Sequence, residues 1–315
     1  MTTISLTTFA MREEENTPHK FESLSELHRA LGLPNPQHPL VSLIVNDVKD
    51  VDVNRLPQYY ILTYYVISYK TKLSGKIRYG QGHYDFNEGG ILFASPNQII
   101  GTHNHGGDHS GYVLMIHPDF LRNYPLAARI KKYGFFSYSA NEALHLSDKE
   151  KEIVNSVFQI IENELNSRID DFTQDVIIAQ IELLLNYANR FYKRQFLTRK
   201  AVSNDLLQSL EYLLDEYFSA QKPLCEGIPT VQYLSQQLNV SPSYLSDMLR
   251  SLTGQNAQQH IHNKLIEKAK ELLSTTQLTV SEVAFGLGFE HPQSFSKMFK
   301  SKTKSSPLTF RRSFN

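Results

Sequence analysis

The chain has 315 residues, of which 41% are hydrophobic and 20% are charged. This is an ordinary globular balance, and the length predicts two domains, or two domains and a helical connector. Lysines with arginines and aspartates with glutamates number 32 each, so the total charge gives no indication of a nucleic-acid partner. The single cysteine, Cys225, excludes an internal disulfide and fits a reducing compartment.

The sequence shows neither the pattern of a secretion signal nor that of a membrane span. Its best apolar run, residues 176–185, is too short to cross a bilayer and contains Gln180 and Glu182. We therefore expect a cytoplasmic protein with no membrane partner.

The first half of the chain is strand-like. Residues 39–116 contain short runs rich in Tyr, Ile, Val and Thr, such as 59–69, separated by glycines and by Pro96. Many short strands with Gly and Pro turns favour a β-sandwich or a barrel. Before them, residues 23–31 predict a short helix that ends at Gly32.

The middle of the chain is helical. Ser147 followed by Glu150 forms a capping box that opens a helix running to about Asn166. A second helix begins near Asp171 and carries one apolar stripe at helical spacing. The stripe consists of Val176, Ile177, Ile181, Leu184, Leu185, Ala188 and Tyr192. It could belong to the core or form the seam of a dimer, and residues 201–204 beyond it are expected to be a linker.

The C-terminal third is helical throughout and contains an internal repeat. Residues 244–253 match residues 294–303 at an offset of fifty. Each copy follows a short helix and a tight turn, which contains Asn239 in the first copy and Gly288 in the second. Asn or Gly there supplies left-handed backbone. Two helices joined by such a turn form the DNA-binding helix-turn-helix, whose second helix fits the major groove.

The side chains of each second helix divide between two faces. One face is expected to be core, with Leu245, Met248 and Leu249 in the first copy and Phe295, Met298 and Phe299 in the second. The opposite face, together with the residues that open each helix, could reach base edges or phosphates. It consists of Ser241, Ser243, Tyr244, Ser246, Asp247 and Arg250 in the first copy and of His291, Gln293, Ser294, Ser296, Lys297 and Lys300 in the second. Residues 260–273 predict a helix that fixes the spacing of the copies.

Charge is unevenly distributed along the chain. Residues 291–315 contain six lysines or arginines and no acid. They are Lys297, Lys300, Lys302, Lys304, Arg311 and Arg312. A basic end of this kind is typical of a protein that binds a polyanion.

These residues resemble the AraC/XylS family of regulators from 205 to 312. The matching segments are 241–245, 253–254, 269–273, 283–289, 295–300 and 306–311. Three residues depart from the family pattern: Lys264 stands for the usual Arg, Lys304 for Gly, and Asp247 for a basic or amide residue. In the first half, residues 82–98 resemble part of the family's cupin-like barrel.

The resemblance implies an α+β protein in three parts. Residues 1–140 would form a cupin-like β-barrel sensor, and residues 141–200 a helical dimerisation connector with a linker. Residues 201–315 would form an all-α DNA-binding domain with helix-turn-helix motifs at about 230–254 and 280–304. The implied function is regulation of transcription without catalysis, on promoter or operator double-stranded DNA. The implied partners are a second copy in a homodimer, RNA polymerase and a small-molecule effector in the barrel.

The sequence leaves two other functions open. His103, His105 and His109 include a His-x-His pair, a common metal-ligand spacing. Metal cupins would also have a glutamate shortly after the second histidine, and none follows until Glu142. We therefore expect no metal or other cofactor, although a metal-cupin enzyme fused to a DNA-binding end is one alternative. The other is a constitutive DNA binder whose barrel only pairs subunits.

Tyrosines on the predicted strands could line an effector pocket. They could equally be ordinary strand residues, because tyrosine has a high β-propensity. The candidates are Tyr59, Tyr60, Tyr64, Tyr65, Tyr69, Tyr79 and Tyr84.

Overall fold

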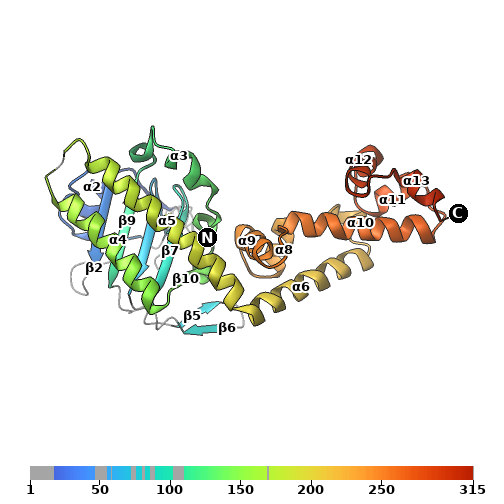
Figure 1. The fold of residues 1–315 in the computed structure, drawn as a ribbon, viewed down its shortest axis with the longest axis horizontal. Coiled ribbons are helices and arrows are strands. Elements are labelled where there is room, and N and C mark those ends of the chain that lie inside the picture. The colour runs from blue at the N-terminus through green and yellow to red at the C-terminus, as the bar shows by residue number, and fades with distance from the viewer. Residues whose placement is uncertain are drawn as a thin grey trace, which may run out of the picture. The chain divides into compact units, whose positions relative to one another are not determined.

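The structure is a computed structural model that describes residues 18–46, 55–57, 59–71, 76–79, 82–85, 89–101, 110–168 and 170–314. The chain divides into two compact units, residues 1–192 and residues 193–315. Figure 1 shows that the described strands all belong to the first unit and that the second unit is built of helices. In the described residues, no helix is both long and apolar enough to span a membrane.

Two sheets and a hairpin pair make up the strand part of the first unit. The larger sheet has five antiparallel strands in the order β10-β7-β4-β9-β2. They are β2 (Val41–Asn46), β4 (Tyr65–Lys70), β7 (Gly90–Ala94), β9 (Gly111–Ile116) and β10 (Leu144–His145). The smaller sheet, in the order β1-β3-β8, consists of β1 (His19–Phe21), β3 (Tyr59–Leu62) and β8 (Ile99–Gly101). The strands β5 (Lys76–Tyr79) and β6 (Gly82–Asp85) pair with each other.

The mixed α+β fold class is therefore confirmed, but the closed barrel is not. The strands of the described ranges do not join into a single closed sheet. They form separate sheets, with β1 running parallel to β3, instead of one continuous ladder of paired strands.

Side chains alternate across the central strand β4. Tyr65, Ile67 and Tyr69 are buried on one face, because successive residues of a strand point to opposite sides. Val66, Ser68 and Lys70 point to the other face and line a cavity. The strand therefore separates a packed aromatic layer from an internal space.

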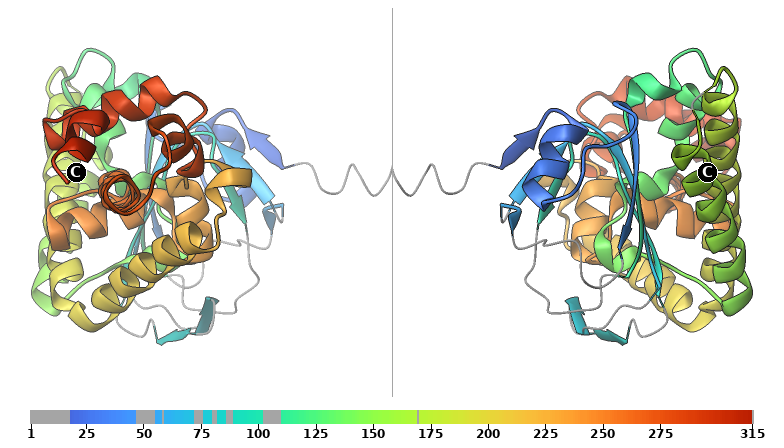
Figure 2. Two further views of the ribbon diagram at one scale, coloured as in Figure 1. Left: turned by 90° about the vertical axis from the view of Figure 1, so that its right-hand side faces the viewer. Right: turned by 90° about the vertical axis from the view of Figure 1, so that its left-hand side faces the viewer.

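Helices cover the two faces of the five-stranded sheet. Figure 2 shows α4 (Asp148–Asn166) and α5 (Thr173–Thr198) on one side of the sheet and α2 (Leu24–Leu31) on the other. On the first side, Phe158 of α4 stacks on Tyr112 with 4.9 Å between ring centroids. On the second side, leucines of α2 share a core cluster with Ile44 and Met115.

The predicted helix boundaries in this unit are confirmed where a cap defines them. Ser147 and Glu150 form the expected capping box, and α4 ends at Asn166. The side chain of Ser23 caps α2, which ends at Gly32 with φ 73°. Short polar motifs thus fix these ends locally.

The apolar stripe of α5 belongs to the core. Ile181, Leu184 and Leu185 are completely buried, and Ala188 is 1% exposed. Only Val176, at the start of the stripe, is half-buried. The alternative that this stripe is the seam of a dimer is therefore excluded, because it already packs within one chain.

Besides the end of α5, the second unit contains eight described helices joined by short turns. They are α6 (Lys200–Ser219), α7 (Pro223–Glu226), α8 (Val231–Gln237), α9 (Pro242–Thr253), α10 (Ala257–Thr275), α11 (Val280–Gly286), α12 (Pro292–Thr303) and α13 (Pro307–Arg312). The prediction that residues 201–204 form a linker is wrong, since they lie inside α6. Residues 200–219 contain neither Gly nor Pro and several leucines, a composition that favours continuous helix.

One pair of neighbouring leucines tests the assignment of the α5 stripe. We expect Leu184→Arg to lower the free energy of unfolding by about 3 kcal/mol or more, because it removes core packing and buries a charge. The matched control is Leu183→Arg, at a position 42% exposed, which should stay folded. Urea unfolding followed by circular dichroism measures both. Equal stability of the two variants would contradict the core assignment.

Candidate nucleic-acid interface and internal cavity

The first helix-turn-helix consists of α8, a tight turn and α9. Thr230 caps α8 by accepting from the Tyr233 amide, and Ser241 caps α9 by accepting from the Tyr244 amide. Asn239 in the turn has φ 54°, the left-handed conformation that its residue type tolerates. Pro242 occupies the first turn of α9, where a missing amide hydrogen has no cost.

The second helix-turn-helix consists of α11, a turn and α12. A capping box between Thr279 and Glu282 opens α11. Gly288 in the turn has φ 87°, and a Cβ there would lie 2.6 Å from the Gly227 carbonyl carbon. Only glycine fits this position, because the turn passes directly against the backbone that follows α7.

Both second helices bury the predicted apolar face. Leu245, Met248 and Leu249 are at most 1% exposed on α9, and Phe295 and Phe299 are fully buried on α12. Met298 is the exception, since it is only half-buried.

The opposite faces differ between the two copies. On α9, Ser243, Tyr244, Ser246 and Asp247 are half-buried and Arg250 is exposed. On α12 the predicted contact residues are more open. His291, Gln293, Ser294, Lys297 and Lys300 are exposed, and Ser296 is half-buried.

Ser241, a predicted DNA contact, also caps the start of α9. It is 7% exposed, and its hydroxyl accepts from the Tyr244 amide at 3.2 Å. His291, which opens α12, makes no side-chain cap and is exposed. The two copies therefore begin their second helices in different ways.

The predicted basic end is mostly exposed. Lys297, Lys300, Lys302, Lys304 and Arg312 are exposed in the structure. Arg311 instead donates its Nε to the Leu273 carbonyl oxygen at 3.2 Å. This hydrogen bond joins α13 to the end of α10. Arg311 therefore has a structural role, although its charge alone had predicted that it contacts DNA.

The first unit contains a cavity of about 470 Å³ between its two sheets. Its lining is mostly aliphatic and aromatic, with residues from β3, β4, β7, β8 and β9. The polar groups include Lys70, Tyr60, Glu142 and Tyr192. Burial raises the pKa of Tyr60 to about 12. Glu142 is 4% exposed and accepts from the Ser139 amide at 2.7 Å.

The structure sorts the candidate ligand residues of the first half. Tyr60 lines the cavity, whereas Tyr64, Tyr65 and Tyr69 are buried in packing around the sheets. The side chains of Tyr79 and Tyr84, and the three histidines His103, His105 and His109, lie outside the described residues. Within the described part of the chain, no group of three or more His, Cys, Asp or Glu is placed to hold a metal ion.

Two further tyrosines line the cavity and were not among the sequence candidates. Tyr138 lies between β9 and β10, and Tyr192 belongs to α5. Tyr192 belongs to the apolar stripe of α5. This position predicts that its side chain is buried, but it does not predict that the side chain lines a cavity.

Comparison with known proteins matches the motifs of the second unit. The family described as Helix-turn-helix domain matches residues 234–313. The arabinose operon regulatory protein of Salmonella typhimurium is 36% identical over 78 residues, which are 25% of this chain and 28% of that protein. The arabinose operon regulatory protein of Escherichia coli is 29% identical over 110 residues, or 35% of each protein.

The second unit therefore carries a helix-turn-helix domain of the AraC type.

A longer match extends into the first unit of the chain. The regulator YfiF of Bacillus subtilis, named as an uncharacterized HTH-type transcriptional regulator, is 23% identical over 255 residues. These residues are 79% of this chain and 77% of that protein. The chain spans about a third of the length of the two arabinose operon regulators.

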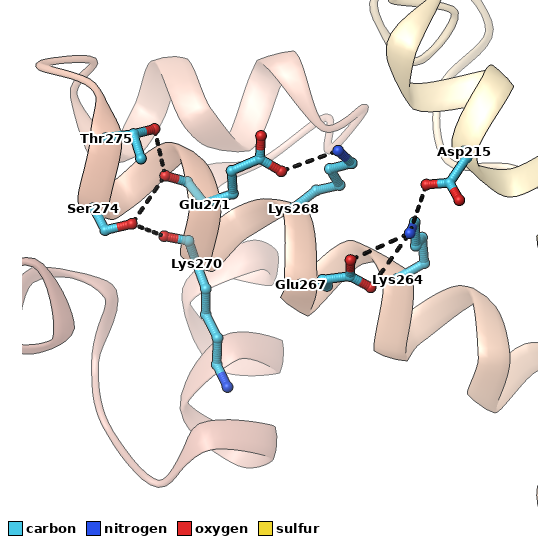
Figure 3. A network of polar contacts seen from close by, with 8 residues as sticks. All are labelled: Asp215, Lys264, Glu267, Lys268, Lys270, Glu271, Ser274 and Thr275. Carbon is cyan, nitrogen blue, oxygen red and sulfur yellow. Dashed lines mark hydrogen bonds and ion pairs between the residues drawn. The ribbon is translucent and has the colours of Figure 1, made fainter.

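The departure from the AraC pattern at Lys264 has a structural reason. Figure 3 shows the Lys264 ammonium on α10 between Asp215 of α6 and Glu267 of α10. The Lys264 nitrogen lies 2.6 Å from the Asp215 carboxylate. Burial opposes the charge, but the hydrogen bonds to both carboxylates outweigh it and raise the pKa of Lys264. The lysine thus joins α6 to α10.

Asp247, the second departure from the AraC pattern with a structural explanation, forms an ion pair on the first recognition helix. Arg250 Nη1 lies 2.8 Å from Asp247 Oδ1, one turn along α9. Exposed pairs of this kind contribute little to stability. The pair nevertheless lowers the net positive charge of α9, whereas Lys297 and Lys300 at the equivalent positions of α12 are both cationic.

Two variants at equivalent positions test this difference in charge. We expect Asp247→Ala to release Arg250 for a phosphate, to raise affinity for all duplexes and to steepen the salt dependence of log K by roughly 0.9. Lys297→Ala should make the salt dependence of log K less steep by a similar amount. Fluorescence anisotropy between about 50 and about 200 mM salt measures both. A loss of affinity for one selected sequence in Asp247→Ala would instead mean that Asp247 reads a base.

Proposed function

We propose that this chain regulates transcription by placing α9 and α12 in successive major grooves of promoter or operator DNA. The observation that carries the proposal is the repeat itself, with two recognition helices in helix-turn-helix copies that both pack on α10. Their polar faces contain the twelve candidate contact residues, from Ser241 to Arg250 and from His291 to Lys300. Successive grooves on one side of a duplex are about 10 base pairs apart.

The exposed cations next to α12 support an anchoring role for the second copy. Five lysines or arginines between positions 297 and 312 are exposed, and the segment contains no acid. In this proposal the second helix-turn-helix holds the phosphates and the first adds sequence discrimination. RNA polymerase is the further partner that regulation of a promoter requires.

A fragment of residues 200–315, which begins with α6, tests the electrostatic part. If all five exposed cations contact phosphates, log K should fall with log salt with a slope of about −4.5, at roughly 0.9 for each contact. Titration of a labelled duplex of mixed sequence measures the slope. A folded fragment with no salt-sensitive binding would contradict the proposal.

We further propose that a small molecule binds in the cavity of the first unit. Its volume of about 470 Å³ lies in the range of ligand sites. An apolar lining with a few polar groups fits a compact, mainly apolar molecule that carries one or two polar substituents. This is the responsive function that the family resemblance implies, and it distinguishes the chain from a constitutive DNA binder.

Thermal unfolding of the full chain with a library of such molecules tests the cavity. A ligand at a hundredfold excess over its Kd stabilises the bound form by about 2.7 kcal/mol. Ala94 lines the cavity, so Ala94→Phe should remove the shift. The matched control Ala128→Phe, at an exposed helical position, should keep it. The same shift in both variants would place the ligand elsewhere.

We propose that two copies of the chain pair through the outer face of α5 and not through its buried stripe. Phe172, immediately before α5, is 70% exposed and Leu183 is 42% exposed, and half-buried Val176 lies between them. Asp175 lies near the start of this face and Arg190 near its end. An antiparallel second copy would set acid against base, so the folded control Leu183→Arg should sediment as a monomer.

A further inference from the structure

The two recognition helices differ along one flank. Tyr244, Asp247 and Ser251 follow one another at helical spacing on α9, and all three are half-buried. The residues fifty positions later on α12 are all exposed. Both helices have 12 residues and open on a proline, so the difference does not come from the helix-turn-helix itself. Another part of the second unit covers the flank of α9.

The end of α5 lies against this flank. Phe196 meets Tyr244 edge to face, with 5.2 Å between ring centroids and 76° between ring planes. Phe196 is 3% exposed, and its neighbour Gln195 is 2% exposed. The hydroxyl of Ser203 in α6 donates to the Phe196 carbonyl oxygen at 3.1 Å. Residues 195–203, called the α5–α6 junction here, therefore form a packed piece next to the recognition helix.

This junction lies outside the segment that the helix-turn-helix family covers, which begins at residue 234. It belongs to the second unit, whereas α5 begins at Thr173 in the first unit. The same helix contributes Leu184 and Leu185 to the core of the unit that holds the cavity. The junction is thus helically continuous with the proposed sensor.

We propose that the α5–α6 junction competes with DNA for the first recognition helix. An α-helix with its side chains is about 10–12 Å wide and the major groove is about 12 Å wide, so the groove accepts one helix without a second beside it. While Phe196 rests on Tyr244, the flank that also carries Asp247 is covered and α9 stays out of the groove. The exposed α12 binds alone until the junction moves away. The inference rests on the proposed DNA-binding function.

Selection from a library of randomised duplexes, with the full chain as bait, tests the competition. Wild-type protein should enrich one specified half-site. Phe196→Ala should enrich two half-sites about 10 base pairs apart and bind such a duplex about 2- to 10-fold more tightly, the range expected for loss of one aromatic contact. Leu197→Ala, one residue further at a position 49% exposed, is the matched control and should behave as wild type.

The outcomes separate this inference from the proposed function. No enrichment by any of the three proteins would contradict DNA binding itself. Enrichment of identical sites with identical affinity by wild type and Phe196→Ala would overturn the competition alone and leave DNA binding standing.

A second measurement does not depend on the stability of the alanine variant. The chain contains no tryptophan, so Phe196→Trp introduces a single reporter at the contact with Tyr244. Its emission should shift to the red when a duplex with two half-sites saturates the protein, because the ring leaves its buried position. Leu197→Trp is already exposed and should not shift. Unshifted emission of Phe196→Trp in a complex whose footprint covers both half-sites would overturn the proposal.

Discussion

Both helix-turn-helix copies depend on the buried face of a single helix, α10. Ile261, Leu265 and Ala269 are completely buried and Leu273 is 1% exposed. These residues recur at helical spacing over 19 residues, so the helix presents one continuous apolar stripe to its neighbours. A stiff helix of this length, about 28 Å at 1.5 Å per residue, holds the two recognition helices at a fixed separation. The polar bridges of Lys264 and Arg311 then attach α6 and α13 to the same helix.

The helical part of this arrangement was predictable because its signals are local. Caps such as Ser147 and Thr279 lie within three residues of their partners, and Gly288 marks a turn that no other residue fits. The repeat at an offset of fifty is enough to locate α9 and α12 in the sequence. Each of these features depends on a few neighbouring residues, which the sequence displays directly.

The features that the sequence did not reveal depend on contacts between distant residues. The separation of the strands into two sheets follows from pairing partners such as β1 with β3, which no local pattern specifies. Residues 201–204 were predicted to be a linker because they follow a strongly basic stretch, yet they continue α6. Phe196 is one aromatic residue in a polar stretch, and its importance comes only from the ring of Tyr244 almost fifty residues later.

The C-terminal end of α12 has a less favourable backbone conformation than the C-terminal end of α9. Gly254 closes α9 with φ 77°, whereas Lys304 closes α12 in the same left-handed conformation with φ 62°. For a residue with a Cβ this backbone is less favourable by on the order of 1 kcal/mol. Hydrogen exchange in the last turn of α12 should therefore report easier local opening than in the last turn of α9. At this position the chain keeps a cation beside the recognition helix and accepts a more readily frayed end.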